Sequence, residues 1–315
     1  MKLLWITDPW ATLDHPRDTT LRLIQEFAVQ GVPSWLCDTP GLRLEHGEPR
    51  IRCRPVVSIP ATRHAEGWGL GPAEDHPVGF FDVVHYRVDP PVDRHYWEPL
   101  QLLRLAEFAG VRTRFVNPLP VLALVSDKLG PAHLVGHLPA TVVASDWQDL
   151  EGFGREQRIT VLKPLGDAAS RAVHLLDWTT TAGADRARAL VEQVSDRFSR
   201  PVVLQQYLDE IRTVGETRLW FAEARLIGYA RKRPVAETFL VDMDRGATCE
   251  PCRLSEAEAK VAASIGRALR ESGVALAAVD LIGAYSGDVD RLSRRKPIAR
   301  SGASRSPGSV MAIAP

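Results

Sequence analysis

Short apolar runs alternate with helical segments through the first 120 residues, and this alternation limits which folds the chain can adopt. The runs "KLLWIT", "PSWLCD" and "FFDVVHYRVD" predict strands, and "RTRFVN" predicts a further short strand. The segment "DTTLRLIQEFAVQGV" predicts a helix with Asp18 or Thr19 as its N-cap and Gly31 as its C-cap. A second helix, predicted over residues 90–110, is opened by two prolines and ended by a glycine. Strand–helix–strand alternation of this kind indicates a parallel α/β sheet.

The pattern changes near residue 120, where prolines cluster, and we place a domain boundary there. Strands dominate the predicted second domain, residues 121–290, in runs such as "RITVLK", "PVVLQQYL", "ETRLWFAE" and "VALAAVDLIGAY". A short helix is predicted to carry Lys128, and longer helices are predicted over residues 184–199 and 255–273. Ser255 suits the N-cap of the last helix and Gly273 its C-cap.

The last segment, residues 291–315, differs from the rest of the chain. It holds five arginines, five serines and no acidic residue, and it shows no helical or strand periodicity. Little apolar surface is then available to offset the entropy cost of ordering, so we expect a disordered or loosely attached tail. A frameshift that replaced an original C-terminus is an alternative explanation.

Composition excludes several classes of partner. Lys plus Arg number 39 and Asp plus Glu number 39, so the net charge is zero and gives no broad attraction to nucleic acid or to anionic lipid. No apolar run approaches the 18 residues or so of a membrane span, and we expect a cytoplasmic location. Cys249 and Cys252 form a C-x-x-C pair, which could be a redox couple, half of a zinc site or simply two thiols in a turn.

Lysines and acids in the second domain suggest nucleotide and metal chemistry. Lys128 and Lys163 lie on separate predicted elements and could contact the phosphates of ATP, and Lys163 ends a buried strand where an unpaired charge is costly. Asp280 lies inside an apolar strand, and Asp288 and Asp290 follow it at positions that share one face if they form a strand. A hairpin could bring the three carboxylates together as oxygen ligands for Mg²⁺, although a solvated turn explains "SGDVD" equally well.

The neighbouring strands offer further candidates for a nucleotide site. The segment "VVLQQYLDEI" could present backbone polar groups to an adenine edge, with Tyr207 and Leu208 as apolar walls. Glu216 could accept from ribose hydroxyls. Arg218 and Arg233 lie on successive predicted strands and could face the phosphates or an acyl phosphate.

The order of these features resembles the prokaryotic-type glutathione synthetase, an ATP-grasp carboxylate–amine ligase. The matching segments run from residue 1 to about residue 290 and include "FDVVHYRVDPPVD", "SDKL", "VLKPL", "LQQYLDEI", "GETR" and "AVDLIGAY". The resemblance implies an α/β chain in which an N-terminal parallel α/β (pre-ATP-grasp) domain precedes an ATP-grasp domain. It also implies ATP and Mg²⁺ as cofactors, an amino acid or short peptide as substrate, and a possible homo-oligomer.

The resemblance further assigns roles to residues at matching positions. Lys128 and Lys163 would contact the phosphates of ATP, Glu216 would lie at the ribose, and Arg87 of the R-x-D-P-P segment would face the peptide substrate. Arg218 and Arg233 fall on family arginines near the phosphates and the reacting carboxyl group. The adenine contacts and the metal ligands complete the set: Gln205, Gln206, Tyr207 and Leu208 for adenine, and Asp280, Asp288 and Asp290 for Mg²⁺.

The chain departs from the family pattern at four places. The family loop after "KPL" is rich in glycine, whereas residues 167–172 read "DAASRA", which predicts weaker closure over the γ-phosphate and a raised KM for ATP. The metal pair is Asp-x-Asp instead of Glu-x-Asn, Phe239 follows Thr238 where the family has arginine, and the tail lacks the family's final helix. These departures motivate the alternative of a non-catalytic, nucleotide-binding ATP-grasp descendant.

Overall fold

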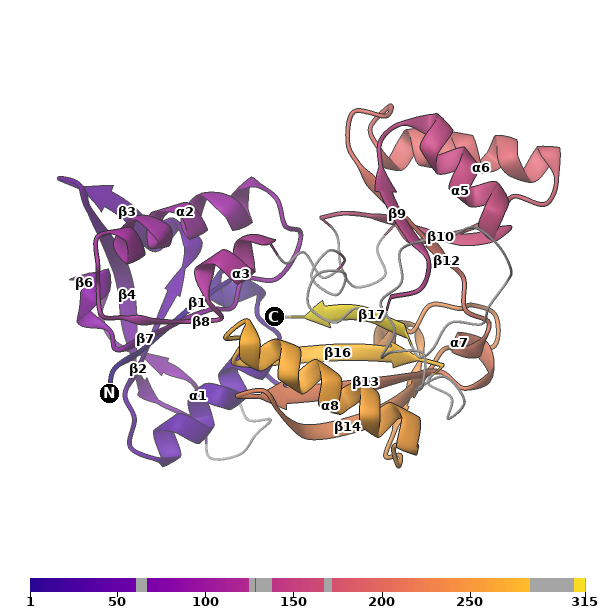
Figure 1. Cartoon of the computed structure of the whole chain (residues 1–315). Helices are drawn as coiled ribbons and strands as arrows, with labels where there is room; N and C mark the ends of the chain where they lie inside the picture. Colours follow the sequence, from indigo (N-terminus) through magenta and orange to yellow (C-terminus); the bar gives the residue numbers. More distant parts are fainter. Residues whose placement is uncertain (61–66, 125–127, 129–137, 167–171, 284–308, 315) are drawn as a thin grey trace. The chain divides into compact units, whose positions relative to one another are not determined.

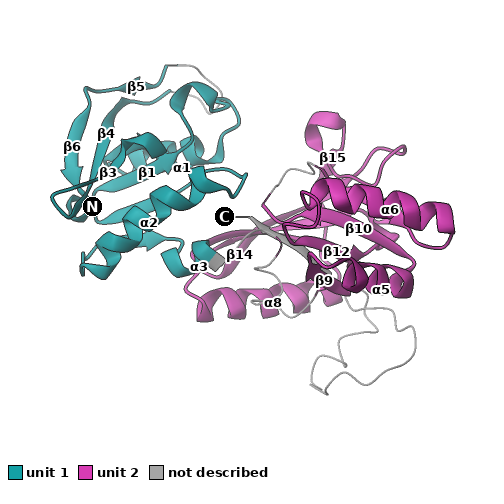
Figure 2. Ribbon diagram, turned by 90° about the horizontal axis from the view of Figure 1, so that it is seen from above, with its two compact units in different colours: residues 1–123 teal, residues 124–315 magenta. Residues whose placement is uncertain are grey.

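The chain forms two compact units, residues 1–123 and residues 124–315, which are described separately (Figures 1 and 2). The structure is a computed structural model, and it describes residues 1–60, 67–124, 128, 138–166, 172–283 and 309–314. Among these residues, no helix combines the length and the apolar character that crossing a bilayer requires.

Unit 1 is built on a sheet in which a parallel part continues into an antiparallel part. The strand order is β3-β4-β2-β1-β7-β8, and both β5 and β6 pair with β4. The strands are β1 (Leu3–Thr7), β2 (Ser34–Asp38), β3 (Leu42–Glu45), β4 (Glu48–Ser58), β5 (Gly69–Leu70), β6 (Glu74–Pro77), β7 (Val83–Tyr86) and β8 (Arg114–Val116). Strands β2, β1, β7 and β8 are parallel, as the alternation predicts, whereas β3 to β6 pair in antiparallel fashion.

The antiparallel part of the sheet was not predicted from the sequence. Strands β3 and β4 form a tight hairpin in which Glu45 pairs with Glu48 across His46 and Gly47. Both loop residues have positive φ, 51° and 83°, as a two-residue hairpin loop requires. The dipeptide His-Gly between "RLE" and "EPRIR" was therefore the available signal for this hairpin.

Two helices of unit 1 begin at aspartate caps. Helix α1 (Thr19–Val29) begins after Asp18, whose carboxylate accepts from the backbone N–H of Leu21 at 2.8 Å, so Asp18 and not Thr19 is the N-cap. Helix α2 (Arg94–Phe108) begins after Asp93, which caps His95 in the same way. The prediction that two prolines open this helix is wrong: Pro90 and Pro91 precede its cap, and a residue that precedes proline is disfavoured in helical conformation. A short helix, α3 (Leu119–Leu124), follows β8.

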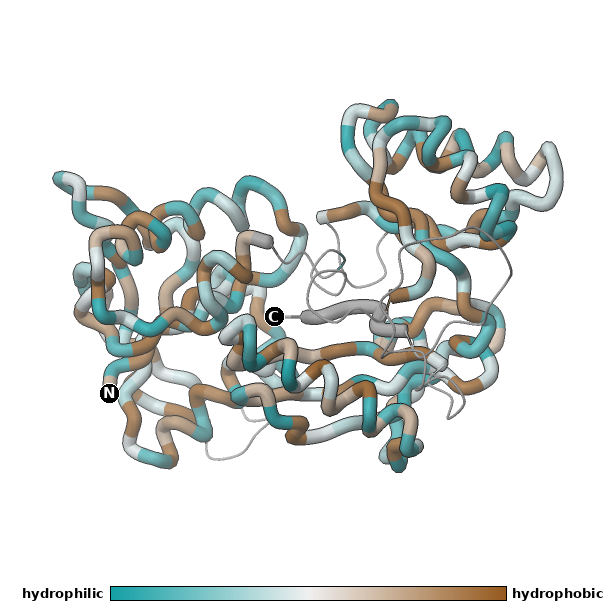
Figure 3. Tube along the Cα trace, in the orientation of Figure 1, coloured by the Kyte–Doolittle hydropathy of each residue, from teal (hydrophilic) through white to brown (hydrophobic). Residues whose placement is uncertain are grey.

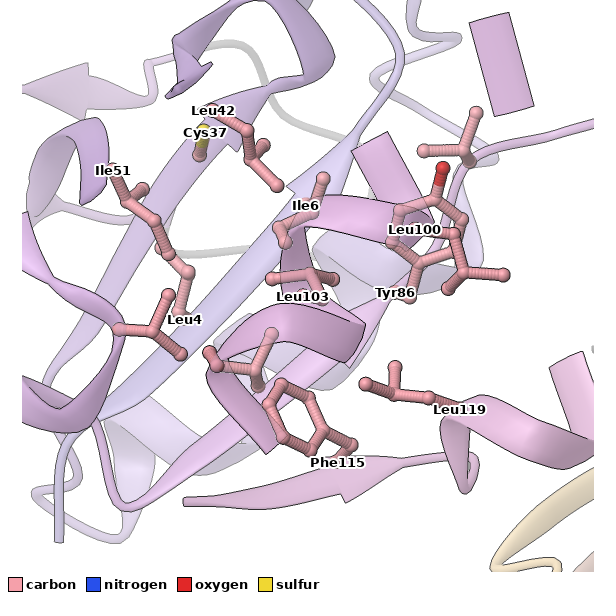
Figure 4. Packing of buried hydrophobic residues seen from close by; sticks show 14 of the residues in the cluster. Leu4, Ile6, Cys37, Leu42, Ile51, Tyr86, Leu100, Leu103, Phe115 and Leu119 are labelled. Carbon is pink, nitrogen blue, oxygen red and sulfur yellow. The ribbon is translucent and has the colours of Figure 1, made fainter. Parts of the chain in front are cut away.

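Alternate residues of β1 enter two separate apolar cores. Leu4 and Ile6 pack with α2 residues such as Leu103 (Figure 4). Leu3 and Trp5 instead pack with the residues of α1. Successive side chains of a strand point to opposite faces of the sheet, so both faces of β1 are buried. This double burial explains why "LLWIT" is apolar throughout.

Unit 2 contains two antiparallel sheets. A four-stranded sheet has the order β11-β10-β12-β9, and a five-stranded sheet has the order β15-β14-β13-β16-β17. The strands are β9 (Thr141–Ala144), β10 (Ile159–Pro164), β11 (His174–Asp177), β12 (Val202–Gln206), β13 (Glu216–Ala222), β14 (Arg225–Arg233), β15 (Thr248–Glu250), β16 (Leu276–Ile282) and β17 (Ser309–Ala314). The helices are α5 (Trp147–Gln157), α6 (Thr181–Val194), α7 (Glu210–Thr213) and α8 (Glu256–Glu271).

Each sheet of unit 2 has helices on one face. Leu150 of α5 and Ala187 of α6 join Leu162 and Leu204 of the four-stranded sheet in one core. Helix α8 lies along the five-stranded sheet (Figure 1), so close that a Cβ at Gly266 would lie 2.8 Å from the backbone oxygen of Ala224. One face of each sheet therefore forms a core with helices.

Helix α8 has the caps that its sequence predicts. Ser255 caps the helix in a capping box with Glu258, and Gly273, at φ +71°, follows the C-cap Ser272. Hydrophilic and hydrophobic segments alternate along the helix (Figure 3), and Ile265 on its apolar face is fully buried. By contrast, the helix predicted over residues 184–199 is found at Thr181–Val194, because Thr180 caps it earlier than expected.

The last segment contains one strand among its described residues. Residues 309–314 form β17, which pairs with β16 in antiparallel fashion. The run "SVMAIA" is apolar enough to form an edge strand, and the arginine-rich composition of the preceding residues obscured it. Residues 291–308, like most of the segment around Lys128, lie outside the described residues.

Candidate active site

The two faces of the five-stranded sheet have different chemistry. On β13, Thr217 faces α8, because its hydroxyl donates to the carboxylate of Glu258 at 2.7 Å. The neighbouring residues Glu216, Arg218 and Trp220 therefore point to the opposite face. We call the side opposite α8 the open face of this sheet; Trp220 is 37% exposed there, whereas Glu216 is buried.

A bidentate ion pair joins two strands on the open face. Arg218 of β13 and Asp280 of β16 are direct cross-strand partners. The guanidinium donates through Nε to Oδ1 at 2.7 Å and through Nη2 to Oδ2 at 2.5 Å. Paired planar contacts of this kind are the strongest geometry available to arginine and carboxylate. The structure thus brings together two residues that the sequence predicts for phosphate and metal binding.

A second ion pair extends this arrangement into a cluster. Glu216 of β13 and Lys232 of β14 are also cross-strand partners, and Lys232 Nζ donates to Glu216 Oε1 at 2.9 Å. Lys232 Nζ also lies 3.9 Å from Asp280 Oδ1. We call Glu216, Arg218, Lys232 and Asp280 the charge cluster. Lys232 was not predicted from the sequence, although "RKR" in a strand that could pair with "GETR" was a possible signal.

The charge cluster is largely removed from water. Glu216, Lys232 and Asp280 are 3%, 9% and 5% exposed. Burial, followed by the charge of Asp280, raises the pKa of Glu216 to about 7, and the positive charge of Lys232 opposes this rise. Two charges of each sign balance, but burying them costs free energy that ion pairing only partly recovers. Perturbed ionisable groups of this kind are concentrated at functional sites.

The three consecutive basic residues of β14 have different partners. Arg231 Nη2 donates to Glu258 of α8 at 2.9 Å, on the covered face. Arg233 Nε donates to Glu250 of β15 at 3.1 Å, and the Arg233 side chain is 45% exposed. Because adjacent residues of a strand alternate, Lys232 is the member of this trio that joins the charge cluster. The structure therefore does not bring Arg233 to Arg218.

A polar row crosses the open face of the four-stranded sheet. Lys163 Nζ of β10 donates to Gln205 Oε1 of β12 at 2.8 Å, and Gln205 Nε2 donates to Thr141 Oγ1 of β9 at 2.9 Å. Leu162 and Leu204, their sequence neighbours, enter the core with α5 and α6. Lys163 is 7% exposed and Gln205 is 5% exposed. A buried ammonium group at a strand end, away from the helices, is suited to an anionic ligand.

The segment after β12 contains an aromatic contact. The ring of Tyr207 packs edge to face with Phe239, with centroids 5.8 Å apart, and the Tyr207 hydroxyl accepts from Arg212 Nε at 3.1 Å. Tyr207 and Leu208 are half-buried, and Gln206 precedes them at the end of β12. Phe239 thus gives Tyr207 an apolar neighbour.

Arg87 lies in unit 1, at the end of β7. Its Nε donates to the hydroxyl of Thr20 in the first turn of α1 at 3.1 Å. Burial is the main cause of a lowered pKa for Arg87. Next to it, the backbone N–H of Asp89 donates to Asp8, which follows β1. These contacts tie the R-x-D-P-P segment to the carboxyl ends of two parallel strands, where α/β sheets bind ligands.

Some predicted site residues lie outside the described residues or apart from the cluster. Asp288, Asp290 and the glycine-poor loop 167–171 are not described, and Lys128 lies half-buried in a turn. Within the described part of the chain, no three His, Cys, Asp or Glu side chains form a group that could hold a metal. Cys249 lies in β15 and Cys252 follows this strand, and both are free thiols.

The donors of the charge cluster suit magnesium. Asp280 and Glu216 present carboxylate oxygens on one sheet face, and Mg²⁺ prefers hard oxygen ligands. Both oxygens of Asp280 accept from Arg218, so a metal ion would replace at least one of these hydrogen bonds. The residues therefore fit the ion in type, with Asp280 as the described member of the predicted set.

The structure has an ATP-grasp fold. The structure is similar to the crystal structure of D-cycloserine synthetase DcsG, with a TM-score of 0.63 at 17% identity over 99% of this chain and 90% of that chain. It is also similar to a RimK domain ATP-grasp protein from Sphaerobacter thermophilus, with a TM-score of 0.60 at 17% identity over 99% and 90% of the two chains. At this identity the likeness concerns the fold.

The chain belongs to the prokaryotic glutathione synthetase family. The family's N-terminal domain matches residues 1–119, and its ATP-grasp domain matches residues 127–294. Glutathione synthetase of Parasynechococcus marenigrum is 31% identical over 92% of this chain and 90% of its own length. That of Prochlorococcus marinus strain MIT 9313 is 30% identical over the same shares.

Family membership decides between the two functions that the sequence left open. The protein is an ATP-binding ligase that forms an amide bond from small amino acid or peptide substrates. The alternative of a non-catalytic nucleotide-binding module is not favoured, because the matches extend through both domains of an enzyme family. The predicted family and fold class are thereby confirmed.

Proposed function

We propose that this protein forms glutathione by joining γ-glutamylcysteine to glycine, with conversion of ATP to ADP and phosphate. The observation that carries the proposal is the buried charge cluster, in which Arg218 and Asp280 pair across the open face of the five-stranded sheet. An ATP-dependent ligase needs cations for the phosphates and carboxylates for the metal, and the cluster contains both. The choice of γ-glutamylcysteine and glycine as substrates follows from the relatives named glutathione synthetase.

In the proposed site, Asp280 would hold Mg²⁺ together with the predicted ligands Asp288 and Asp290. The bound ion would neutralise phosphate charge during transfer. Arg218, which lies beside Asp280 on the adjacent strand, would donate to a phosphate oxygen of the nucleotide. The Arg218–Asp280 pair thus provides one positive and one negative group on adjacent strands, for the phosphates and for the metal ion.

The nucleotide would lie against the polar face of the four-stranded sheet. Lys163, with Lys128, is suited to the phosphates, because its ammonium group is buried and turned away from the α5–α6 core. Gln205, Gln206, Tyr207 and Leu208 would line the adenine, and the contact with Phe239 stiffens the Tyr207 wall. Glu216 would accept from the ribose hydroxyls.

The proposed ligation has two steps, formation of an acyl phosphate and attack by an amine. The γ-phosphoryl group of ATP passes to the cysteinyl carboxylate of γ-glutamylcysteine, which gives an acyl phosphate and ADP. The amine of glycine attacks the acyl carbon, phosphate leaves with the bonding electrons, and the amine loses a proton. Arg218 would stabilise the charge on the transferred group. The role of Arg233 in this step stays a prediction, since Arg233 is paired with Glu250.

Arg87 is suited to a carboxylate of the peptide substrate. The hydroxyl of Thr20 accepts from Nε of Arg87. The terminal guanidinium nitrogens would then form the fork that binds a carboxylate.

Assembly into a homo-oligomer and a cytoplasmic location remain predictions from the sequence. Light scattering of the purified protein would measure the first.

The test is ADP release with defined acid–amine pairs, with the product identified by mass spectrometry. Release with γ-glutamylcysteine plus glycine, and formation of glutathione, would support the proposal. Release with another pair and none with this one would show a ligase of different specificity. Absence of ADP release with every pair, in folded protein that binds ATP, would refute a ligase activity in this chain.

A further inference from the structure

Strand β14 carries three consecutive cationic residues, and each donates a hydrogen bond to a different glutamate. Arg231 is held by Glu258 on the α8 face, and Arg233 is held by Glu250 of the edge strand β15. Lys232 reaches the open face and contacts Glu216. The resemblance to the family points to Arg233 as a site residue, but the geometry points to Lys232.

Lys232 contacts carboxylates on two different strands. Its Nζ donates to Glu216 Oε1 on the adjacent strand β13 at 2.9 Å, and it lies 3.9 Å from Asp280 Oδ1 on β16, one strand further. Lys232 is 9% exposed, so these contacts are shielded from water. An ammonium group has three donors and no fixed plane, and it can therefore serve two carboxylates that lie in different directions.

The need for such a cation arises when Arg218 changes partner. In the structure, both Asp280 oxygens accept from Arg218. Once Arg218 donates to a nucleotide instead, Glu216 and Asp280 are two buried like charges on neighbouring strands. Lys232 is placed to remain between them and to keep both carboxylates where the nucleotide and its metal would meet them.

We propose that Lys232 is a positioning residue of the ATP site, which holds Glu216 and Asp280 in place for the metal–nucleotide complex. It is the cation that β14 contributes to the site in place of Arg233. This inference rests on the proposed function for the site itself, and it adds a residue that neither the sequence pattern nor the family resemblance identifies. It predicts that loss of Lys232 impairs the coupling between Mg²⁺ and nucleotide more than it impairs the fold.

The experiment measures ADP binding by calorimetry with and without Mg²⁺, which does not depend on turnover. In the wild type, Mg²⁺ is expected to tighten ADP binding. Lys232→Met should reduce this tightening by about 10-fold, the order found when a partner of a metal ligand is lost. Lys232→Arg, which keeps the charge, should recover most of it. Lys260→Met, the same change at an exposed lysine of α8, is the matched control and should bind as the wild type does.

Two further variants separate positioning from folding. Lys232→Met leaves Glu216 buried without its cation, so Glu216→Gln combined with Lys232→Met restores neutrality. The double variant should fold and still lack the Mg²⁺ effect. Wild-type tightening in Lys232→Met or in the double variant, or a larger loss in Arg233→Met than in Lys232→Met, would overturn the inference. If the wild type itself shows no Mg²⁺-dependent ADP binding, the proposed function fails, and the inference falls with it.

Discussion

The guanidinium of Arg218 and the carboxylate of Asp280 form a two-point ion pair across β13 and β16, with Nε–Oδ1 at 2.7 Å and Nη2–Oδ2 at 2.5 Å. Their register is direct, so the pair is set by the pairing of the two strands and not by flexible side chains alone. A pre-set pair of opposite charges on an open sheet face is suited to bind an ion complex that contains both a metal and phosphates.

Asp280→Asn should abolish most of the activity. The amide keeps the size of the side chain but removes the charge that Arg218 and a metal ion require, so ADP release should fall by about 100-fold or more. Steady-state ADP assays measure this. Asp196→Asn, at an exposed position after α6, is the control and should leave the rate unchanged. Near-normal ADP release in Asp280→Asn would remove Asp280 from the site.

Glu216 should make stability fall as pH rises. Its pKa is raised from 4.5 to about 7 in the folded chain, so the folded state binds a proton that the unfolded state releases between these values. The stabilisation is therefore complete below pH 4.5 and is lost as pH rises through 7, by at most about 1.4 kcal/mol per pH unit. Glu216→Gln cannot titrate.

Urea unfolding at pH 5 and at pH 8 would measure this effect. At pH 5, Glu216 is mostly protonated and resembles glutamine, so the wild type and Glu216→Gln should be similar in stability. At pH 8 the variant should gain stability relative to the wild type. An equal difference at both pH values would contradict the raised pKa.

His85 should give the opposite dependence in unit 1. Its ring stacks on Trp5 with centroids 3.9 Å apart, and burial lowers its pKa from 6.5 to about 3. The folded state therefore resists a proton that the unfolded state accepts, and stability is lost as pH falls from 6.5 toward 3. At pH 5 this loss is about 2 kcal/mol.

His85→Phe keeps a ring against Trp5 and removes the titration. Nδ1 of His85 makes no hydrogen bond in the structure, so the substitution removes none at this atom. Hydrogen exchange of β1 and β7, corrected for intrinsic rates, should show that the variant loses less protection than the wild type between pH 7 and pH 5. His95→Phe, at an exposed position of α2, is the control. Equal acid sensitivity of His85→Phe and the wild type would refute the prediction.

Gly215 should be intolerant of any side chain. Its φ is +86°, and a Cβ there would lie 2.2 Å from the backbone oxygen of Lys232. Gly215→Ala should therefore cost about 3 kcal/mol or more, since backbone strain adds to a clash between two strands. Gly246→Ala, at a φ of +89° but with a nearest contact of 3.5 Å to Val235, should cost about 1 kcal/mol. Thermal unfolding would compare the two variants, and equal losses would show that the clash is relieved at little cost.

Local signals were sufficient for much of the fold. Asp18 and Ser255 are found at the N-caps where the sequence predicts caps, because capping depends on a few adjacent residues. The strands around Asp280 and Arg218 were predicted from apolar runs. The antiparallel extension of unit 1 was missed, because its hairpin depends on one His-Gly turn between strands rich in arginine.

The composition of the charge cluster could be predicted only in part, because it depends on strand register. Asp280 and Arg218 were each identified as candidates, but their pairing follows from how β13 and β16 align. Lys232 was missed and Arg233 was chosen, although they are neighbours, because the side of the sheet reverses with every residue. A shift of one residue along β14 therefore separates Lys232, in the charge cluster, from Arg233, which contacts the edge strand β15.

Glu258 connects the beginning of α8 to the strands that carry the charge cluster. One of its oxygens accepts from the backbone N–H of Ser255, and the other accepts from Thr217 of β13 and Arg231 of β14. The carboxylate of Glu258 thus both caps the N-terminus of α8 and bridges β13 and β14. Fraying of the first turn of α8 would therefore remove the acceptor that Thr217 and Arg231 share, so the start of the helix and the two strands are expected to open together.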